Sequence, residues 1–321
     1  MKLEALYRKA VAVGIERDPR GPDEVRGILA EEEAKFAKLS GDEAKAFDLD
    51  RLFNPYADTR MLIGGPEVEV HRAIAGIDME VAEVLLTHTL NKDKAKGIDL
   101  VIAHHPEGRA LARLHDVMRL QADVLAAYGV NISVAEQLME KRIGEVERRL
   151  LPVNHTRTVD AARLLGLPMV CIHTPADNCV VAYLRDLFAR DEPARLKSLV
   201  DRLGKIPEYA RAARIGAGPK IVSGAESGRC GKIFVDMTGG TEGSKAVFEQ
   251  HAIAGVSTIV GMHLSEDALE CAKKANLNVV IAGHISSDTL GLNLLLDELD
   301  KEETLDVIGV SGFERIRSRE R

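Results

Sequence analysis

Two adjacent histidines, His104 and His105, stand where α/β proteins often bind ligands. They follow the apolar run IDLVIA (98–103), which predicts a short buried strand, and they precede Pro106. In open α/β sheets, ligands bind beyond the carboxyl ends of the strands. Because neighbouring strand residues point to opposite faces, each histidine would face its own metal ion, unless Pro106 bends the chain and the two converge. The alternative is a pair of partly exposed loop histidines.

Two further histidines are each followed by an aspartate four residues later. His173 and Asp177 belong to HTPAD, and His284 and Asp288 belong to GHISSD; both motifs follow a predicted strand. This spacing places the imidazole and the carboxylate on one side of a helix, and the pair suits a divalent transition metal. The alternative in both motifs is a helix start, with Asp177 as the N-cap of one helix and a serine as the N-cap of the other.

The three motifs together favour one shared metal site over three coincidences. So many imidazoles and carboxylates exceed the three protein ligands that a catalytic zinc ion usually has. They suit two metal ions bridged by a carboxylate or by water. We therefore predict two divalent ions per chain, with Zn, Mn, Fe or Ni as candidates, because mixed histidine and carboxylate ligands select weakly among these metals.

Other candidate residues carry weaker signals. Asp78 follows the predicted strand 68–77 and either supports a metal ligand by a hydrogen bond or caps the next helix, which is the interpretation we favour. His155 and Asp160 are five residues apart, about 140° around a helix, and so make poor co-ligands. The segment TGGTEGSK (238–245) lacks the Gly-Lys-Ser/Thr order of a phosphate-binding Walker A loop, which leaves an anion-binding turn or a plain connection.

The elements that must position these residues alternate between strands and helices. Short β-rich runs predict strands, and segments with apolar residues at three- and four-residue spacing predict helices between them. This alternation indicates an α/β fold with mixed sheets flanked by helices. The predicted strands are 68–77, 98–103, 168–172, 232–237, 256–260 and 277–282.

The chain divides into three predicted parts. Residues 1–50 are rich in Ala, Glu, Lys and Leu and predict a helical N-terminal extension. The segment 216–231 holds five glycines and is the best candidate for a boundary. We therefore expect a first α/β lobe over 51–215, a second over 216–321, and a metal site between the two lobes.

Composition limits the classes of protein that this chain can belong to. Its 321 residues are 45% hydrophobic and 29% charged, which is ordinary for a globular protein. Four scattered cysteines without a CxxC pair make a disulfide scaffold or a zinc ribbon improbable. A net charge of −7 and a pI of about 5.9 argue against a dedicated nucleic-acid or membrane surface. The N-terminus does not resemble a signal peptide, and no apolar run reaches 18 residues, so we expect a cytoplasmic protein.

The motifs, taken in order, resemble those of the NIF-three-like family (Ngg-one-interacting factor three), often labelled GTP cyclohydrolase I type 2 homologues. The matching stretches cover most of residues 56–300 and include DLVIAHHPEG, CIHTPADN, VDMTGGTEGS and NVVIAGHISSDTLGLNLLLDEL. The resemblance implies a two-lobed α/β protein with a dinuclear metal site and a homohexameric ring. The metal ligands that it implies are His104, His105, Asp177, His284 and Asp288.

The chain also departs from the family pattern. Asp288 stands where the family usually has glutamate, and its shorter side chain leads us to expect binding to one ion rather than a bridge between two. The resemblance places His173 beside the metals rather than among their principal ligands. The helical segment between HHP and HTPAD and the N-terminal helices are additions to the family pattern.

These observations predict a metal-dependent hydrolase that acts on a small phosphorylated or heterocyclic molecule. Two ions that share a water molecule would lower its pKa and make it a nucleophile near neutral pH. The alternative is a metal-binding regulatory assembly without enzymatic activity, because the sequence shows no dedicated general acid or substrate clamp.

Overall fold

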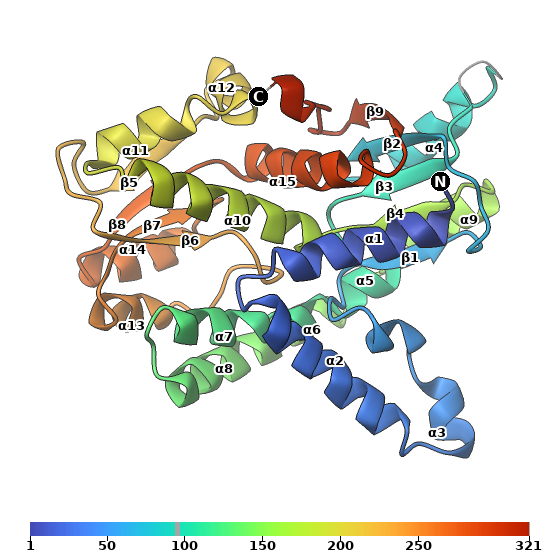
Figure 1. Cartoon of the computed structure of the whole chain (residues 1–321), viewed down its shortest axis with the longest axis horizontal. Helices are drawn as coiled ribbons and strands as arrows, with labels where there is room; N and C mark the ends of the chain where they lie inside the picture. The colour runs from blue at the N-terminus through green and yellow to red at the C-terminus, as the bar shows by residue number, and fades with distance from the viewer. Residues whose placement is uncertain (94–96, 321) are drawn as a thin grey trace.

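The computed structural model describes residues 1–93 and 97–320, which form two β-sheets with helices on both faces (Figure 1). In the first sheet the strand order is β1-β4-β3-β2-β9, with β1 antiparallel to β4 and the other pairs parallel. Its strands are β1 (Arg60–Ile63), β2 (Arg72–Gly76), β3 (Leu100–Ala103), β4 (Met169–Cys171) and β9 (Asp306–Val310).

The second sheet repeats this arrangement with one strand fewer. Its order is β5-β8-β7-β6, with β5 antiparallel to β8 and the other pairs parallel. In both sheets the antiparallel edge strand lies beside a strand that leads into a long helix: β4 leads into α10 (Thr174–Asp191), and β8 leads into α15 (His284–Leu299). The strands are β5 (Lys220–Ser223), β6 (Lys232–Asp236), β7 (Val256–Gly261) and β8 (Asn278–Ile281).

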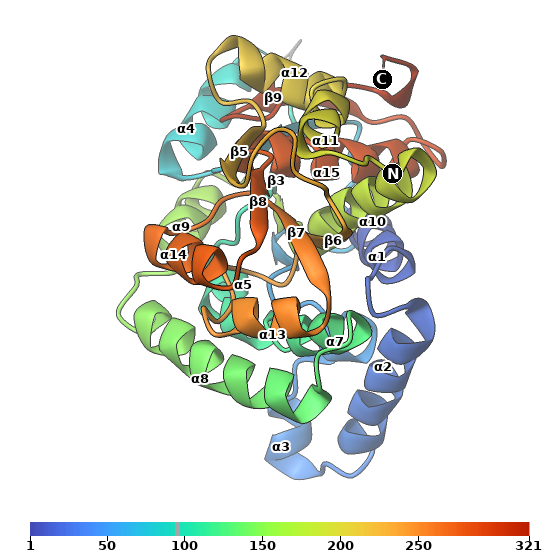
Figure 2. The ribbon, with the colours of Figure 1, turned by 90° about the vertical axis from the view of Figure 1, so that its left-hand side faces the viewer.

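Three long helices share one side of the two sheets: α1 (Leu3–Glu16), α10 (Thr174–Asp191) and α15 (His284–Leu299). Figure 2 shows β7 and β8 between α10 on the right and α14 on the left. No helix in the described part of the chain is long and apolar enough to cross a membrane. The remaining helices are α2 (Pro22–Phe36), α3 (Gly41–Ala46), η1 (Leu49–Leu52), α4 (Val81–Leu90), α5 (Gly108–Ala112), α6 (Leu114–Val117), α7 (Leu120–Ala127), α8 (Ile132–Leu150), α9 (Arg157–Leu164), α11 (Leu196–Leu203), α12 (Pro207–Arg214), α13 (Val247–Ile253), α14 (Glu266–Lys274) and η3 (Ser318–Glu320).

The alternation of side chains along the strands builds a core on each side of the first sheet. Ala73 and Ile102 face the layer of α1 and α15, whereas Ile74 and Val101 face the opposite layer of α4 and α9. Every one of these strand side chains is buried because both faces of the sheet are covered, which explains why the strands are continuous apolar runs.

The predicted α/β class and the mixed sheets flanked by helices are confirmed. The structure also contains three strands that the sequence pattern did not predict, β1, β5 and β9, and each lies at the edge of a sheet. Strand β9 lies within residues 216–321 but pairs with β2 in the first sheet. The C-terminal part of the chain therefore contributes one strand to the first sheet, across the predicted boundary. The division into two lobes stays a prediction.

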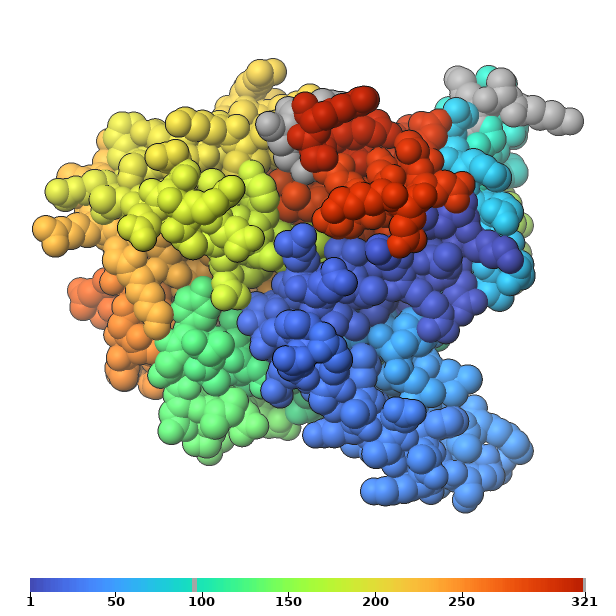
Figure 3. Space-filling model, in the orientation of Figure 1, coloured from blue at the N-terminus to red at the C-terminus, as the bar shows by residue number. Residues whose placement is uncertain are grey.

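The first helix is part of the core rather than an appendage, which differs from the expected extension over residues 1–50. Leu3, Leu6 and Ala10 have no exposed surface and pack into the core between α10 and the first sheet. A Cβ added at Gly14 would lie 2.7 Å from Cβ of Pro175, so α1 contacts the start of α10 directly. Helices α2 and α3 project from the molecule (Figures 1 and 3).

Helices α10 and α15 cross in close contact near their N-terminal ends. At the crossing, a Cβ added to Gly291 would lie 2.4 Å from the carbonyl oxygen of Ala176, so no side chain fits there. Asp177 is the residue after Ala176, and Asp288 is one helical turn before Gly291. The crossing therefore brings the two aspartates of the repeated motif together.

Replacing Gly291 by alanine is expected to destabilise the protein. The methyl group would force α10 and α15 apart at a cost of about 1–3 kcal/mol, which outweighs the gain of about 1 kcal/mol in helix propensity. Urea unfolding measures the difference. Gly27→Ala in α2 is the control, because a Cβ there meets nothing within 4 Å. Equal stability of the two variants would contradict the close crossing.

Candidate metal centre

The carboxyl ends of β3, β4 and β8 supply the histidines of the three motifs. His104 and His105 follow β3 directly, His173 comes two residues after β4, and His284 is the first residue of α15, which follows β8. The carboxyl ends of the two sheets meet at this point, where the first turn of α10 adds Asp177 and the fifth residue of α15 adds Asp288. The five residues predicted as metal ligands therefore lie in one place.

Asp288 lies at the centre of this group. Its Oδ1 is 3.6 Å from Nε2 of His104, and its Oδ2 is 3.3 Å from Nε2 of His105 and 3.4 Å from Nε2 of His284. Asp177 adds a second carboxylate, with Oδ1 3.5 Å from Nε2 of His104. Metal binding itself stays a prediction, but the ligand atoms fall into overlapping groups within 4.8 Å of one another: His104 with Asp177 and Asp288, His105 with His284 and Asp288, and His104 with His105 and His173.

Three buried polar atoms in this cluster lack a hydrogen-bond partner among the residues that the structure describes. They are Nε2 of His104, Oδ1 of Asp177 and Oδ2 of Asp288. His104 is completely buried and Asp288 is only 1% exposed, so solvent does not satisfy these atoms. An unpaired buried carboxylate is costly, and a cation between the imidazole nitrogens and carboxylate oxygens would satisfy all three. The donor set fits divalent transition metals.

Hydrogen bonds on the far side of two imidazoles aim their Nε2 atoms at the cluster. Nδ1 of His104 donates to the carbonyl oxygen of Ile172 at 3.1 Å, and Nδ1 of His105 donates to Asp78 at 2.6 Å. Such outer hydrogen bonds fix the tautomer of metal-binding histidines. Our preferred interpretation of Asp78 as a helix N-cap was wrong, because Glu80 is the N-cap of α4.

The alternative N-cap interpretations of the H-x-x-x-D motifs are also excluded. Helix α10 begins at Thr174 with His173 as N-cap, and α15 begins at His284 with Gly283 as N-cap. Asp177 therefore lies inside the first turn of its helix. The positive φ of 113° at Gly283 allows the chain to turn sharply from β8 into α15.

The expected binding of Asp288 to one ion stays a prediction. The two oxygens of Asp288 face different groups, Oδ1 toward His104 and Oδ2 toward His105 and His284. A carboxylate in this position is suited to bridge two ions. The aspartate side chain is long enough to reach the three imidazoles because α15 starts at the motif itself and crosses close to α10.

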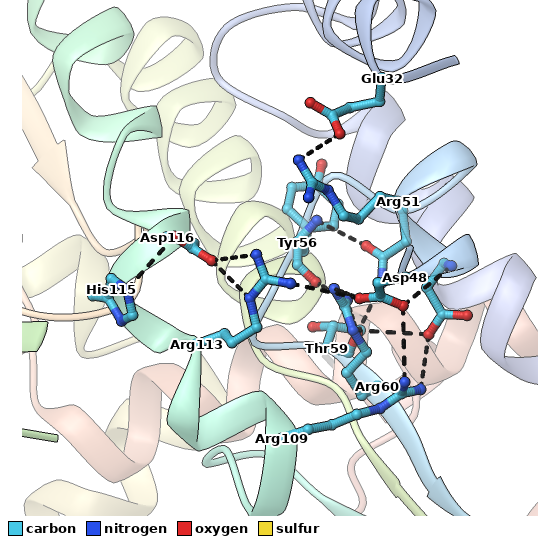
Figure 4. Close-up of polar contacts among 12 residues, drawn as sticks. Glu32, Asp48, Arg51, Tyr56, Thr59, Arg60, Arg109, Arg113, His115 and Asp116 are labelled. Atoms are coloured by element: carbon cyan, nitrogen blue, oxygen red, sulfur yellow. Dashed lines mark hydrogen bonds and ion pairs between the residues drawn. The ribbon is translucent and has the colours of Figure 1, made fainter. Parts of the chain in front are cut away.

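A buried carboxylate that sequence analysis missed, Asp58, holds His173. Its Oδ2 accepts hydrogen bonds from Nδ1 of His173 at 2.8 Å and from Oγ1 of Thr174 at 2.6 Å, and Asp58 has no exposed surface. The loop that carries Asp58 is held by buried Arg60, which donates to the carbonyl oxygens of Tyr56 and Thr59 (Figure 4). Asp58 follows no predicted strand, so no signal in the sequence marked it.

Burial and neighbouring charges shift the pKa values of the groups in the cluster. Burial lowers the pKa of His104 to about 4, which leaves its imidazole neutral near pH 7. Burial raises the pKa of Asp177 well above its usual range, and the nearby Asp288 carboxylate adds to this effect. For Asp288 burial acts in the same direction, but His104 and His105 outweigh it and lower the pKa. A metal ion would relieve the repulsion between the two carboxylates.

Of the remaining candidates, His155 and Asp160 do not belong to the cluster, whereas segment 238–245 borders it. Asp160 is on the surface and pairs with Arg163 at 3.1 Å, and His155 precedes α9. Segment 238–245 does not lead straight into a helix, because α13 begins at Val247, and it forms part of the cavity wall instead. His263 lines the same cavity, with its ring centroid 4.8 Å from that of His284.

Removing the Asp58 carboxylate is expected to change how stability depends on pH. Burial opposes a charge on His173, but Asp177 and Asp58 outweigh it and raise its pKa to about 9. The unfolded value is about 6.5. The interaction of charged His173 with the two carboxylates therefore contributes its full stabilisation below about pH 6.5, and this stabilisation is lost as the pH rises through about 9.

Urea unfolding of the metal-free protein between pH 6 and 10 tests this. Asp58→Asn should show a shallower loss of stability than the unmodified protein, because its His173 titrates at lower pH. Asp160→Asn, at the surface, is the control and should follow the unmodified protein. Identical slopes in Asp58→Asn and the unmodified protein would refute the coupling.

Comparison with solved structures supports the family resemblance. The chain is similar to a NIF3 superfamily protein from Sphaerobacter thermophilus, with a TM-score of 0.69 and 28% identity over 80% of this chain and 92% of that chain. Weaker likenesses, on which no inference rests, are to reduced HcgD from Methanocaldococcus jannaschii (TM-score 0.45, 16% identity, 78% and 87% covered) and to TTHA1606 from Thermus thermophilus (TM-score 0.46, 15% identity, 80% and 90% covered). No protein-family model matches the sequence, and no curated protein matches it. The resemblance indicated by the motifs is nevertheless confirmed by the structure: this chain has the fold of the NIF3 superfamily.

Proposed function

We propose that this protein is a dinuclear divalent-metal hydrolase that acts on a small phosphorylated or heterocyclic substrate. The observation that carries the proposal is a set of three buried atoms without a hydrogen-bond partner among the described residues, Nε2 of His104, Oδ1 of Asp177 and Oδ2 of Asp288, whose residues form one group of possible metal ligands. A cluster built only for stability would pair these atoms, because each unpaired buried polar group costs free energy.

The ligand groups assign the residues to two neighbouring ions. One ion would be held by His104, Asp177 and Asp288, and the other by His105, His284 and Asp288. Asp288 belongs to both groups, which makes it the shared carboxylate. His105 and His284 are partly exposed, whereas His104 and Asp177 are buried, so substrate would approach from the side of the second group.

The protein's own side chains would hold the ions and offer the substrate a proton. Two bound ions would provide Lewis acidity and lower the pKa of a water molecule that they share. His173 is held by Asp58 with Nδ1 engaged, and its Nε2 lies 3.8 Å from Oδ2 of Asp177. A proton held at Nε2 of His173 could hydrogen-bond to negative charge that develops on the substrate.

Metal analysis tests the assignment of ligands. The purified protein should take up about two divalent ions per chain. His284→Ala should weaken one site, Asp177→Ala should weaken the other, and Asp288→Ala should weaken both, because only Asp288 belongs to both groups. Metal titration followed by elemental analysis measures this, with His155→Ala as a control that keeps both ions. Loss of metal in His155→Ala, or undiminished affinity for two ions in Asp288→Ala, would contradict the assignment.

A turnover assay separates the hydrolase from the regulatory alternative. Nucleotides, phosphoesters and heterocyclic amides would be incubated with the metal-loaded and the chelator-treated protein. The hydrolase predicts metal-dependent product formation that falls at least a hundredfold in Asp177→Ala. Stoichiometric metal without turnover of any substrate class would favour a regulatory metal-binding assembly.

We further propose the homohexameric ring that the family resemblance implies. Val81, Leu85 and Leu86 expose apolar side chains on α4, and such a surface is suited to contacts between subunits. Light scattering should give a mass of about six times the 35.0 kDa chain. A monomer at micromolar concentration would refute the ring.

A further inference from the structure

A cleft of about 390 Å³ lies between helix α2 and helices α6 and α7, and we call it the α2 cleft. Its volume falls within the range of small-molecule sites, about 300–1,000 Å³. The loop 54–60 separates it from the metal centre: Ala57 and Arg60 border the cleft, whereas Asp58, between them, binds His173. None of the predicted metal ligands is among the described residues that border the cleft.

The two segments that depart from the family pattern form this cleft. Helix α2 belongs to the N-terminal helices, whereas α6 and α7 belong to the helical segment between the HHP and HTPAD motifs. Figures 1 and 2 show α2 beside these helices, and both segments contribute side chains to the wall. A ligand in the α2 cleft would therefore be specific to this chain and separate from the metal site that the resemblance implies.

The apolar side of α2 borders the cleft instead of a packed core. The buried residues of this helix are Val25 and Glu32. Ile28 and Leu29 follow Val25 at three- and four-residue spacing, are only half-buried, and line the cleft. An apolar helix face normally packs against protein, so the space beside this one is suited to an apolar group of a ligand.

The opposite wall of the cleft is also apolar in its middle. Val117 of α6 and Leu120 of α7 line it, and they are 4% and 2% exposed. Pro55, from the loop that separates the cleft from the metal centre, adds a further apolar surface. A ligand with an apolar body would therefore contact apolar side chains on both sides.

Cationic side chains surround this apolar middle. In the described wall they outnumber the carboxylates by six to four: Arg20, Lys35, Arg51, Arg60, Arg113 and Arg119. The chain as a whole carries a net charge of −7, so this excess of positive charge is local. The wall therefore favours a negatively charged group over a positively charged one.

Three of the arginines have guanidinium groups that a ligand can reach. The side chains of Arg51, Arg113 and Arg119 are 37%, 40% and 65% exposed. Arg20 and Arg60, by contrast, are 7% and 2% exposed and are paired with carboxylates behind the wall. The reachable arginines come from both sides of the cleft, so one bound group can contact α2's neighbour η1 and the start of α7 together.

The pairing of these cations limits how much negative charge the cleft accepts. Glu32 is shared by two cations, with Arg51 2.5 Å and Lys35 2.8 Å from its oxygens (Figure 4 shows the Arg51 contact). Arg119 lies 3.6 Å from Glu140, and both side chains are exposed, so this pair is weak. Because most cations of the wall already share a carboxylate of the protein, the excess suits one carboxylate rather than the larger charge of a phosphate.

We propose that the α2 cleft binds a small carboxylate with an apolar body, such as an aromatic or branched-chain acid. The apolar body packs between Ile28 and Leu29 of α2 and Leu120 of α7, and the carboxylate accepts hydrogen bonds from the exposed guanidinium groups of Arg51 and Arg119. This proposal does not rest on the proposed function, because no predicted metal ligand takes part.

Two probes with the same ring system and different charge test the site. Ligand-observed NMR would compare 2-naphthoate with the neutral 2-naphthamide on the full chain, before and after treatment with a chelator. We expect 2-naphthoate to bind at least ten times more tightly than 2-naphthamide. We also expect its binding to persist after chelation, because the carboxylate contacts arginines and not metal ions.

Variants locate the binding. The double variant Arg51→Met with Arg119→Met should bind 2-naphthoate at least ten times more weakly and should bind 2-naphthamide as before. Leu29→Trp, which fills the cleft, should abolish the binding of both probes. Arg26→Met is the matched control, because Arg26 is an exposed cation of α2 that does not line the cleft. Circular dichroism verifies that each variant is folded.

The outcomes decide on the α2 cleft independently of the proposed function. Equal affinity for the two probes, loss of 2-naphthoate binding on chelation, or unchanged binding in folded Leu29→Trp would overturn the site. If Leu29→Trp does not fold, unchanged 2-naphthoate binding in the double arginine variant overturns it. Binding that depends on the two arginines and survives chelation supports the site, even if no metal-dependent turnover is found and the hydrolase proposal fails.

Discussion

The close approach of two buried carboxylates, Asp177 and Asp288, is the constraint on which the rest of this structure depends. Asp177 lies in the first turn of α10 and Asp288 directly after the first turn of α15, and the two helices cross where Gly291 leaves no room for a side chain beside Ala176. Like charges in a dry site repel each other strongly unless a cation separates them. The packing of α10 against α15 therefore stores an electrostatic cost that a metal centre would offset.

The two sheets position the carboxylates and the histidines around them. Strands β4 and β8 lead into α10 and α15, and the neighbouring strand β3 delivers His104 and His105 to the same point. Helix α1 covers the crossing from outside, with Gly14 against Pro175. The repeated strand order of the two sheets explains why the H-x-x-x-D spacing occurs twice, since each motif marks the start of the helix that follows a corresponding strand.

The sequence predicted the buried elements well because both sides of a buried strand are apolar. It failed at the edges of the sheets: β1, β5 and β9 are half-exposed, and their pairing is decided by distant partners. The five predicted ligands are in fact adjacent, because they follow strands whose ends meet. Asp58 was missed because it lies on a loop whose position depends on Arg60. The place of Asp288 between two groups of histidines could not be derived from the sequence, because side-chain length does not reveal how closely two helices cross.

Anomalous diffraction from crystals soaked in Mn²⁺ or Zn²⁺ would test the central claim most directly. The account predicts two anomalous peaks per chain, on either side of the Asp288 carboxylate, one within bonding distance of His104 and Asp177 and the other within bonding distance of His105 and His284. A single peak, or peaks that leave Asp288 without a metal contact, would contradict it.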